Sequence, residues 1–283
     1  MSAPADPLVT TEWLFERLDA PDIAILDASW FMPGSPTDAR QEFAAGHIPG
    51  AVFFDIDQIS DRSSALPHML PSSGEFAAAV RRLGVRASQT IVVYDSQGIF
   101  SAPRAWWTFR VMGHDAVLVL DGGLPAWTRD GRPLESGWPV PTRGDFKARA
   151  NPALVRDLEA VRAELASHGA QIVDARPAAR FTGEAPEPRA GLRGGHMPGA
   201  LNLPWADLIV ADGRMAEAPA LADAFTAAGV DLALPITTSC GSGISASVLA
   251  LALARLGRTD VAVYDGSWSE WGARADTPVA TGR

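Results

Sequence analysis

The chain has 283 residues, of which 47% are hydrophobic and 20% charged, as in a folded globular protein with room for two domains. The formal net charge of -9 argues against nucleic acid or an anionic membrane as a partner, because both need a basic surface. The N-terminus lacks the basic and apolar stretches of a secretory signal, and a single cysteine, Cys240, fits a reducing compartment. We therefore predict a cytoplasmic protein that does not bind membranes.

Helix and strand signals alternate from the start of the chain. Apolar residues over 14–18 have the spacing of a short helix, and the β-branched run 23–26 is typical of a strand. The apolar runs 91–94 and 117–120 are bounded by Gly, Asp or Ser and predict short buried strands. Such strands alternating with helices predict an α/β domain with a mainly parallel sheet flanked by helices on both faces.

The same order of motifs then occurs a second time. "AILDASW", "GHIPGAVFFDID", "IVVYD" and "GHDAVLVLDGGLPAW" are matched later by "QIVDARP", "GHMPGALNLPWAD", "ITTSC" and "GRTDVAVYDGSWSEW". The separation of matching residues is nearly constant in the pairs Asp27 and Asp174, His47 and His196, Asp95 and Cys240, and Trp127 and Trp271. Both histidines precede Pro-Gly, which predicts a structural role in a turn. We expect one domain in residues 1–130, a linker rich in Gly, Pro and charge over 131–152, and a second domain in 153–283.

In the second copy, helical spacing over 158–165 precedes a strand-like run at 171–173, and further strands are predicted at 236–238 and 261–264. Residues 245–256 are apolar nearly all round, which predicts a buried helix that ends before a glycine. The chain therefore repeats the α/β pattern of its first half.

Cys240 is predicted to lie in a tight loop between a strand that ends near Ser239 and this buried helix. Ligands of open α/β sheets bind at the carboxyl ends of strands. Gly241 and Gly243 allow the loop N–H groups to point inward, and these groups together with the helix dipole would favour a thiolate. We interpret Cys240 as a nucleophile; the alternative is a cysteine that only packs at a helix start. The first copy has Asp95 at the matching position, so only the second copy is predicted to be catalytic.

The same strand–loop–helix arrangement serves cysteine-dependent phosphatases, which need an arginine six residues after the cysteine to clamp the phosphoryl oxygens. That position is Ala246, and the loop residues 241–245 include no cation. Phosphoryl transfer is therefore disfavoured.

The duplicated "GHIPGA" and "GHMPGA" blocks, the "DGSWSEW" ending and the cysteine loop resemble the rhodanese superfamily over nearly the whole chain. Within it, "CGSGIS" is similar to the loop of 3-mercaptopyruvate sulfurtransferases, typically CGSGVTA, and differs from the basic loop of thiosulfate sulfurtransferases, typically CRKGVTA. Ile244 and Ser245 stand where Val and Thr are usual. The resemblance implies two tandem rhodanese-like domains and a Cys240 persulfide that carries sulfur from 3-mercaptopyruvate to a thiol, cyanide or reduced dithiol-protein acceptor, with release of pyruvate. Thiosulfate is the alternative donor.

The resemblance also implies how the donor is bound. Arg180 and Arg189 match the pair that holds the substrate carboxylate and carbonyl, a task suited to planar guanidinium groups. The alternative is two solvated arginines paired with Glu184 and Glu187. The loop residues assigned to substrate binding by the same resemblance are Gly241, Gly243, Ile244 and Ser245.

A proton relay is implied by the block "DIDQISDRSSALPHMLP", which is similar to the family pattern DIDxxSDxxSxxxHMLP and points to Asp57 and His68. Ser242, two residues after the cysteine, matches the third member. The second copy has Ala206 where the first has Asp57, so this acid is not a requirement of the fold. Because Asp57 and His68 come from the first copy, we expect a site between the two copies. No metal and no organic cofactor is predicted, since there is no ligand cluster, dinucleotide fingerprint or P-loop.

Overall fold

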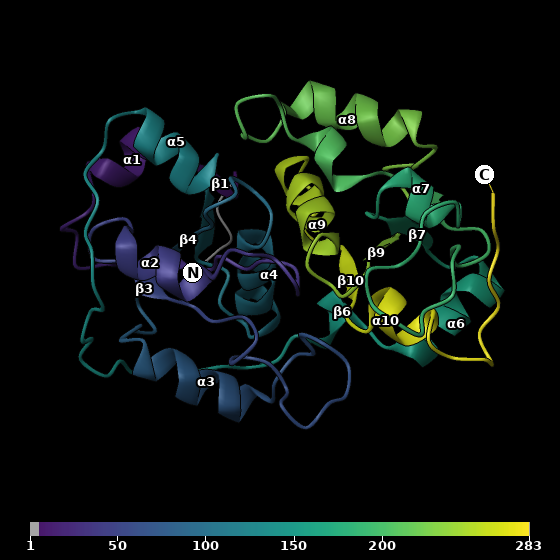
Figure 1. Ribbon diagram of the computed structural model, residues 1–283, viewed down its shortest axis with the longest axis horizontal. Helices are drawn as coiled ribbons and strands as arrows, with labels where there is room; N and C mark the ends of the chain where they lie inside the picture. The colour runs from purple at the N-terminus through teal and green to yellow at the C-terminus, as the bar shows by residue number, and fades with distance from the viewer. Residues whose placement is uncertain (1–5, 283) are drawn as a thin grey trace. The chain divides into compact units, whose positions relative to one another are not determined.

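The computed structural model describes residues 6–282, which divide into two compact units. The first contains residues 6–62, 71–151 and 210–215, and the second contains residues 63–70, 152–209 and 216–282. This division differs from the contiguous one expected from the sequence, because two short segments belong to the unit that is not their neighbour along the chain. In Figure 1 the colour follows the chain through both units, from purple at the N-terminus to yellow at the C-terminus.

The first unit is built on a five-stranded sheet in the order β1-β5-β4-β2-β3, and all neighbouring strands pair in parallel. Its strands are β1 (Leu8–Val9), β2 (Ile23–Asp27), β3 (Val52–Phe53), β4 (Thr90–Tyr94) and β5 (Val117–Leu120). Its helices are α1 (Thr11–Phe15), α2 (Ala39–Ala45), α3 (Ser73–Arg82), α4 (Ala102–Val111) and α5 (Gly123–Arg129).

The second unit repeats this plan with a sheet in the order β6-β10-β9-β7-β8, again parallel throughout. Its strands are β6 (Val155–Arg156), β7 (Gln171–Asp174), β8 (Leu201–Asn202), β9 (Ile236–Ser239) and β10 (Ala262–Tyr264). Its helices are α6 (Leu158–Ser167), α7 (Ala178–Phe181), α8 (Ala218–Ala227), α9 (Ala246–Arg255) and α10 (Ser267–Trp271), with 3-10 turns η1 (Pro152–Leu154) and η2 (Trp205–Leu208). The two sheets correspond strand for strand, which confirms the predicted duplication and the α/β class.

The central strand of each sheet is followed by the most buried helix of its unit. Helix α4 packs on β4 and β5, and α9 packs on β9 and β10 (Figure 1). Residues 246–254 of α9 are all buried, so the prediction of a helix without a solvent face is confirmed. Gly257, with φ +84°, follows its end as predicted. The predicted helix near the N-terminus is shorter than expected and ends at Phe15.

The paired histidines have the structural role that their repetition predicts. The His47 ring stacks on Phe43 with 4.0 Å between ring centroids, and its Nδ1 donates to the Phe43 carbonyl at 2.8 Å. His196 makes the same two contacts with Phe181, at 3.8 Å and 2.8 Å. Both rings therefore fix the turn before the third strand of their sheet.

The predicted linker is held against the first unit by backbone hydrogen bonds. His47 N donates to Glu135 O at 2.8 Å and Glu135 N donates back to His47 O at 2.9 Å. Further along, Arg149 N donates to Met112 O at 2.8 Å. Residues 131–151 therefore form part of the first unit rather than a free tether.

Asp27, at the end of β2, is a buried carboxyl group whose charge is costly. Burial raises the pKa of Asp27 to about 6, despite hydrogen bonds from Ser29 and Tyr94. The folded protein thus binds a proton more tightly than the unfolded chain, so this group stabilises the fold less as the pH rises from about 4 to about 6. We expect the free energy of unfolding, relative to that of Asp27→Asn, to fall by up to about 3 kcal/mol over this range.

Urea unfolding of both proteins between pH 4 and pH 7 checks this expectation. Asp22→Asn removes an exposed carboxylate from the same unit. Its free energy of unfolding should change with pH as that of the wild type does. If the free energy of unfolding of Asp27→Asn also changed with pH as that of the wild type does, the raised pKa of Asp27 would be contradicted.

Candidate active site

Cys240 lies where the sequence predicts, directly after the central strand β9 and before helix α9. Its side chain is buried, with 2% of the residue exposed. The Gly243 N–H donates to Cys240 Sγ at 3.1 Å, and Gly243 has the left-handed φ of +82° that its predicted role in a sharp turn requires. Ser242 and Ile244 are buried, and Ser245 precedes the first residue of α9. The loop thus holds the sulfur at the carboxyl edge of the sheet, where α/β proteins bind ligands.

The corresponding loop of the first unit is filled by the side chain of Asp95. Its Oδ2 accepts hydrogen bonds from the N–H groups of Phe100 at 2.8 Å, Ser101 at 2.9 Å and Ala102 at 2.8 Å. Its Oδ1 accepts another from Gln97 N at 2.9 Å. The loop after the central strand is therefore built to surround a negative charge, and the first unit supplies that charge from its own side chain.

The two predicted arginines of the second unit lie over the cysteine loop. A Cβ added to Gly241 would stand 3.1 Å from Arg180 Nη2 and 4.0 Å from Arg189 Nη1. Glycine at this position therefore leaves space for the Arg180 guanidinium group, and the Arg189 guanidinium group lies within van der Waals distance of the same point. The side chain of Arg180 is only 20% exposed, so the alternative of a solvated arginine does not hold for it. Cys240, Gly241, Arg180 and Arg189 are thus brought together as predicted.

A buried ion network holds Arg180 in this position. Glu187, whose side chain is 1% exposed, accepts from Arg180 Nε at 3.3 Å and also binds Arg180 Nη2. The same carboxylate accepts from Arg176 Nη1 at 2.7 Å, and Arg176 Nη2 donates to Asp174 Oδ2 at 2.7 Å. Burial would lower the pKa of Arg176, but the two carboxylates outweigh it and the pKa is raised.

From the sequence Glu187 is expected only as the partner of a solvated arginine, and the buried ion network is not predicted. Two signals pointed to it: Arg176 follows β7 by two residues, and the first copy has Ser29 at the matching position. A cation present in only one copy is not required by the fold, so Arg176 is one of the features that distinguish the unit that carries Cys240.

His68 lies in the first copy along the chain, but by its contacts its segment belongs to the compact unit that holds Cys240. Its backbone has φ +62°, and Leu70 N donates to Asp265 Oδ2 at 2.8 Å, next to β10. Arg189 Nη2 donates to His68 Nε2 at 3.4 Å. The buried imidazole is therefore joined to one of the two arginines over the loop.

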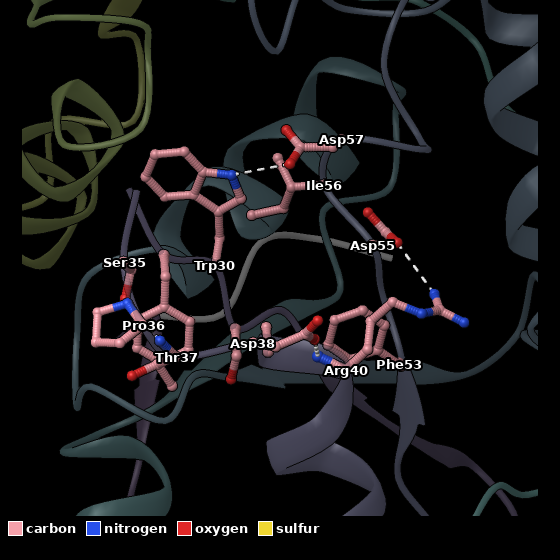
Figure 2. A pocket seen from close by; sticks show the side chains of 13 residues that line it. Trp30, Ser35, Pro36, Thr37, Asp38, Arg40, Phe53, Asp55, Ile56 and Asp57 are labelled. Carbon is pink, nitrogen blue, oxygen red and sulfur yellow. Dashed lines mark hydrogen bonds and ion pairs between the residues drawn. The ribbon is translucent and has the colours of Figure 1, made fainter. Parts of the chain in front are cut away.

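Asp57 belongs to the first unit, where it lines a cavity of about 330 Å³ at the carboxyl ends of β2 and β3. Figure 2 shows the Trp30 indole pointing toward it, and Trp30 Nε1 donates to Asp57 Oδ2 at 3.1 Å. Nearby, Arg40 Nη1 pairs with Asp55 Oδ2 at 3.1 Å. The role predicted for Asp57 in proton transfer stays a prediction.

Two properties of the described residues bear on other classes of function. Among residues 6–282, no helix is both long and apolar enough to cross a membrane. The same residues hold no group of three or more His, Cys, Asp or Glu side chains arranged to bind a metal ion.

Comparison with known proteins defines the class to which this fold and loop belong. Residues 10–130 and 157–274 each match the rhodanese-like domain, so the chain belongs to the rhodanese family with two tandem domains. It is 51% identical over 274 residues to the 3-mercaptopyruvate sulfurtransferase of Escherichia coli K12, covering 96% of each chain. It is also 43% identical over 274 residues to the thiosulfate sulfurtransferase of Gallus gallus, covering 95% of this chain and 94% of that one.

A solved structure supports the same classification. The crystal structure of SseA from Escherichia coli, described as a 3-mercaptopyruvate sulfotransferase with the rhodanese fold, has a TM-score of 0.86 and 47% identity. The match covers 94% of this chain and 100% of that one. The predicted family and fold are therefore confirmed.

Proposed function

We propose that this protein is a 3-mercaptopyruvate sulfurtransferase that works through a persulfide on Cys240. The observation that carries the proposal is the pair of guanidinium groups, from Arg180 and Arg189, over Gly241 beside the buried sulfur. Mercaptopyruvate has its carboxylate and carbonyl several bonds from the thiol, so cations that bind it belong on the wall of the site and not within the cysteine loop. Planar guanidinium forks suit both oxygen groups.

The reaction has two steps. The Cys240 thiolate attacks the donor sulfur, the carbon–sulfur bond of the donor breaks, and its electron pair passes to the pyruvate enolate. The proton of the donor thiol is transferred to the enolate carbon, which yields pyruvate and leaves a Cys240 persulfide. An acceptor thiolate or cyanide then attacks the outer sulfur and regenerates the Cys240 thiolate. The N–H of Gly243, 3.1 Å from Sγ, favours negative charge on the cysteine sulfur.

Thiosulfate is the competing donor, and the Gallus gallus relative carries that name. The compact dianion needs cations close to the sulfur, whereas residues 241–245 of this chain carry no charge. We expect kcat/KM to be larger for 3-mercaptopyruvate than for thiosulfate when both donors are assayed with cyanide as acceptor. Equal or greater efficiency with thiosulfate would contradict the proposed donor.

The acceptor is proposed to be a small thiol, cyanide or a reduced dithiol protein, because each supplies a nucleophile for the outer sulfur. We also propose a cytoplasmic location, since the persulfide cycle needs Cys240 reduced. These two proposals rest on chemistry and not on the geometry of the site.

Ser242, His68 and Asp57 are proposed to move the proton between donor thiol and enolate. We expect His68→Ala and Asp57→Ala each to lower kcat by about 100-fold, a magnitude common for general acid–base groups. Cys240 should still react with iodoacetamide in both variants, because the nucleophile is untouched. Full turnover in both variants would exclude the relay.

A further inference from the structure

Helix α10 begins beside the cysteine loop and holds its backbone at four points. Trp268 N donates to Cys240 O at 2.9 Å, and Ser269 N donates to Gly241 O at 2.9 Å. The Ser269 hydroxyl donates to the same Gly241 oxygen at 2.6 Å, and Ser267 Oγ accepts from Cys240 N at 3.3 Å. Two serine side chains therefore contribute directly to the position of the nucleophile.

The first unit shows which of these contacts the fold itself requires. In the repeat alignment, Leu124 stands at the position of Trp268, and its N–H donates to Asp95 O at 3.0 Å. Gly123 and Pro125 stand at the positions of the two serines. Glycine has no hydroxyl, and proline has neither a hydroxyl nor an N–H, so the other three hydrogen bonds cannot form there. Only the unit that carries the cysteine has them.

Ser267 also adopts a backbone conformation that favours glycine. Its φ is +50°, and the matching Gly123 has φ +54°, so the two units share this turn. Ser267 is fully buried, and its hydroxyl donates to Tyr264 O at 2.8 Å while it accepts from Cys240 N. A serine in this conformation is strained, and such strain is concentrated at functional sites.

We propose that Ser267 and Ser269 are positioning residues that fix the backbone of Cys240 and Gly241 for sulfur transfer. The inference rests on the proposed function, because it takes Cys240 as the nucleophile. The serine hydroxyls hold the loop so that Sγ keeps its contact with Gly243 N and its place beneath the arginines. Small displacements of a reacting atom lower the rate strongly, even when binding is intact.

The test separates the Ser267 hydroxyl from its backbone strain. Ser267→Gly removes both, whereas Ser267→Ala removes the hydroxyl and keeps the strain. We expect kcat with 3-mercaptopyruvate to fall about 10-fold in both variants, with KM unchanged because Arg180 and Arg189 are intact. The Tm should fall in Ser267→Ala but stay the same or rise in Ser267→Gly. If kcat fell only in Ser267→Ala, the variant with the lowered Tm, and stayed at the wild-type value in Ser267→Gly, Ser267 would have a structural role. That result would overturn the proposal for Ser267.

Two further variants complete the test. Ser269→Ala should lower kcat by about 10-fold, again with KM unchanged. His168→Gly is the matched control, because His168 has φ +53° and is exposed at the end of α6. It should relieve similar strain and leave kcat at the wild-type value.

Alkylation of Cys240 by iodoacetamide tests the positioning without any sulfur donor. Release of the loop should expose the buried sulfur, so the alkylation rate should rise several-fold in Ser267→Gly and Ser269→Ala and stay unchanged in His168→Gly. If the wild type transfers sulfur from neither donor, the proposed function fails, and the alkylation rates still decide the positioning role. Wild-type alkylation rates and kcat in both serine variants would overturn that role.

Discussion

Replacing Cys240 with serine should reduce release of pyruvate from 3-mercaptopyruvate by at least ~10³-fold, to the level of the uncatalysed reaction. Serine is close to cysteine in size, so the buried loop and the hydrogen bond from Gly243 N have an equivalent partner in the variant. What is lost is the sulfur atom, which alone can accept a second sulfur and form a persulfide. Pyruvate release and the intact mass of the protein after exposure to the donor measure the two consequences.

Cys240→Ala provides the comparison for this experiment, because it removes the polar atom altogether. Both variants should keep a Tm close to that of the wild type, and neither should gain the mass of one sulfur atom. The first unit cannot accept the sulfur in place of Cys240, since its corresponding loop is filled by the Asp95 carboxylate. Pyruvate release or added sulfur mass in Cys240→Ser would show that another group accepts the sulfur.

Those parts of the fold that are determined by residues close together in the sequence could be predicted from the sequence alone. Helix α9 is an example, because its uninterrupted apolar run and the glycine after it mark a buried helix without knowledge of its partners. The strand–loop–helix arrangement around Cys240 follows from the same local signals. The duplication added that both units share one topology, whereas the order of the strands within each sheet is seen only in the structure.

Features that depend on partners distant in sequence were harder to predict. Glu187 lies in a loop rich in charge, and such a loop usually faces solvent; its burial follows from Arg176, which the end of β7 places beside it. His68 precedes the division between the two copies in sequence, yet its segment belongs to the unit of Cys240. The serines of "DGSWSEW" were visible as a motif, but only the contacts of α10 with the cysteine loop reveal what they hold.

Replacing Glu187 with glutamine should raise KM for 3-mercaptopyruvate by about 10-fold, which corresponds to about 1.4 kcal/mol of donor binding, with a smaller change in kcat. Glu187 binds both Nε and Nη2 of Arg180, which fixes the plane of the guanidinium group over Gly241. Glutamine keeps the size of the side chain but replaces one acceptor oxygen with a donor. Arg180 would then lose its fixed orientation, while Arg176 keeps its contact with Asp174.

Electrostatics alone predicts the opposite result, which makes this variant informative. Removing a negative charge near two arginines should strengthen the binding of an anionic donor and lower KM. Weaker binding would therefore come from lost contacts of the Glu187 carboxylate with the arginines, of which Arg180 is the one over Gly241, and not from the change in charge. Glu184→Gln is the matched control, because it makes the same change in net charge at an exposed position of the same loop and should leave KM nearly unchanged.

A comparison of two alkylating reagents separates this effect from the identity of the donor. Iodoacetate carries a carboxylate and iodoacetamide does not, so the ratio of their rates with Cys240 reports how well the arginines bind an anion beside the sulfur. The ratio should fall in Glu187→Gln, and it should fall no further when that change is combined with Arg180→Met, since the two side chains act as one unit. A ratio that rises in Glu187→Gln would mean that the charge of Glu187 opposes anion binding more than its contacts with Arg180 assist it.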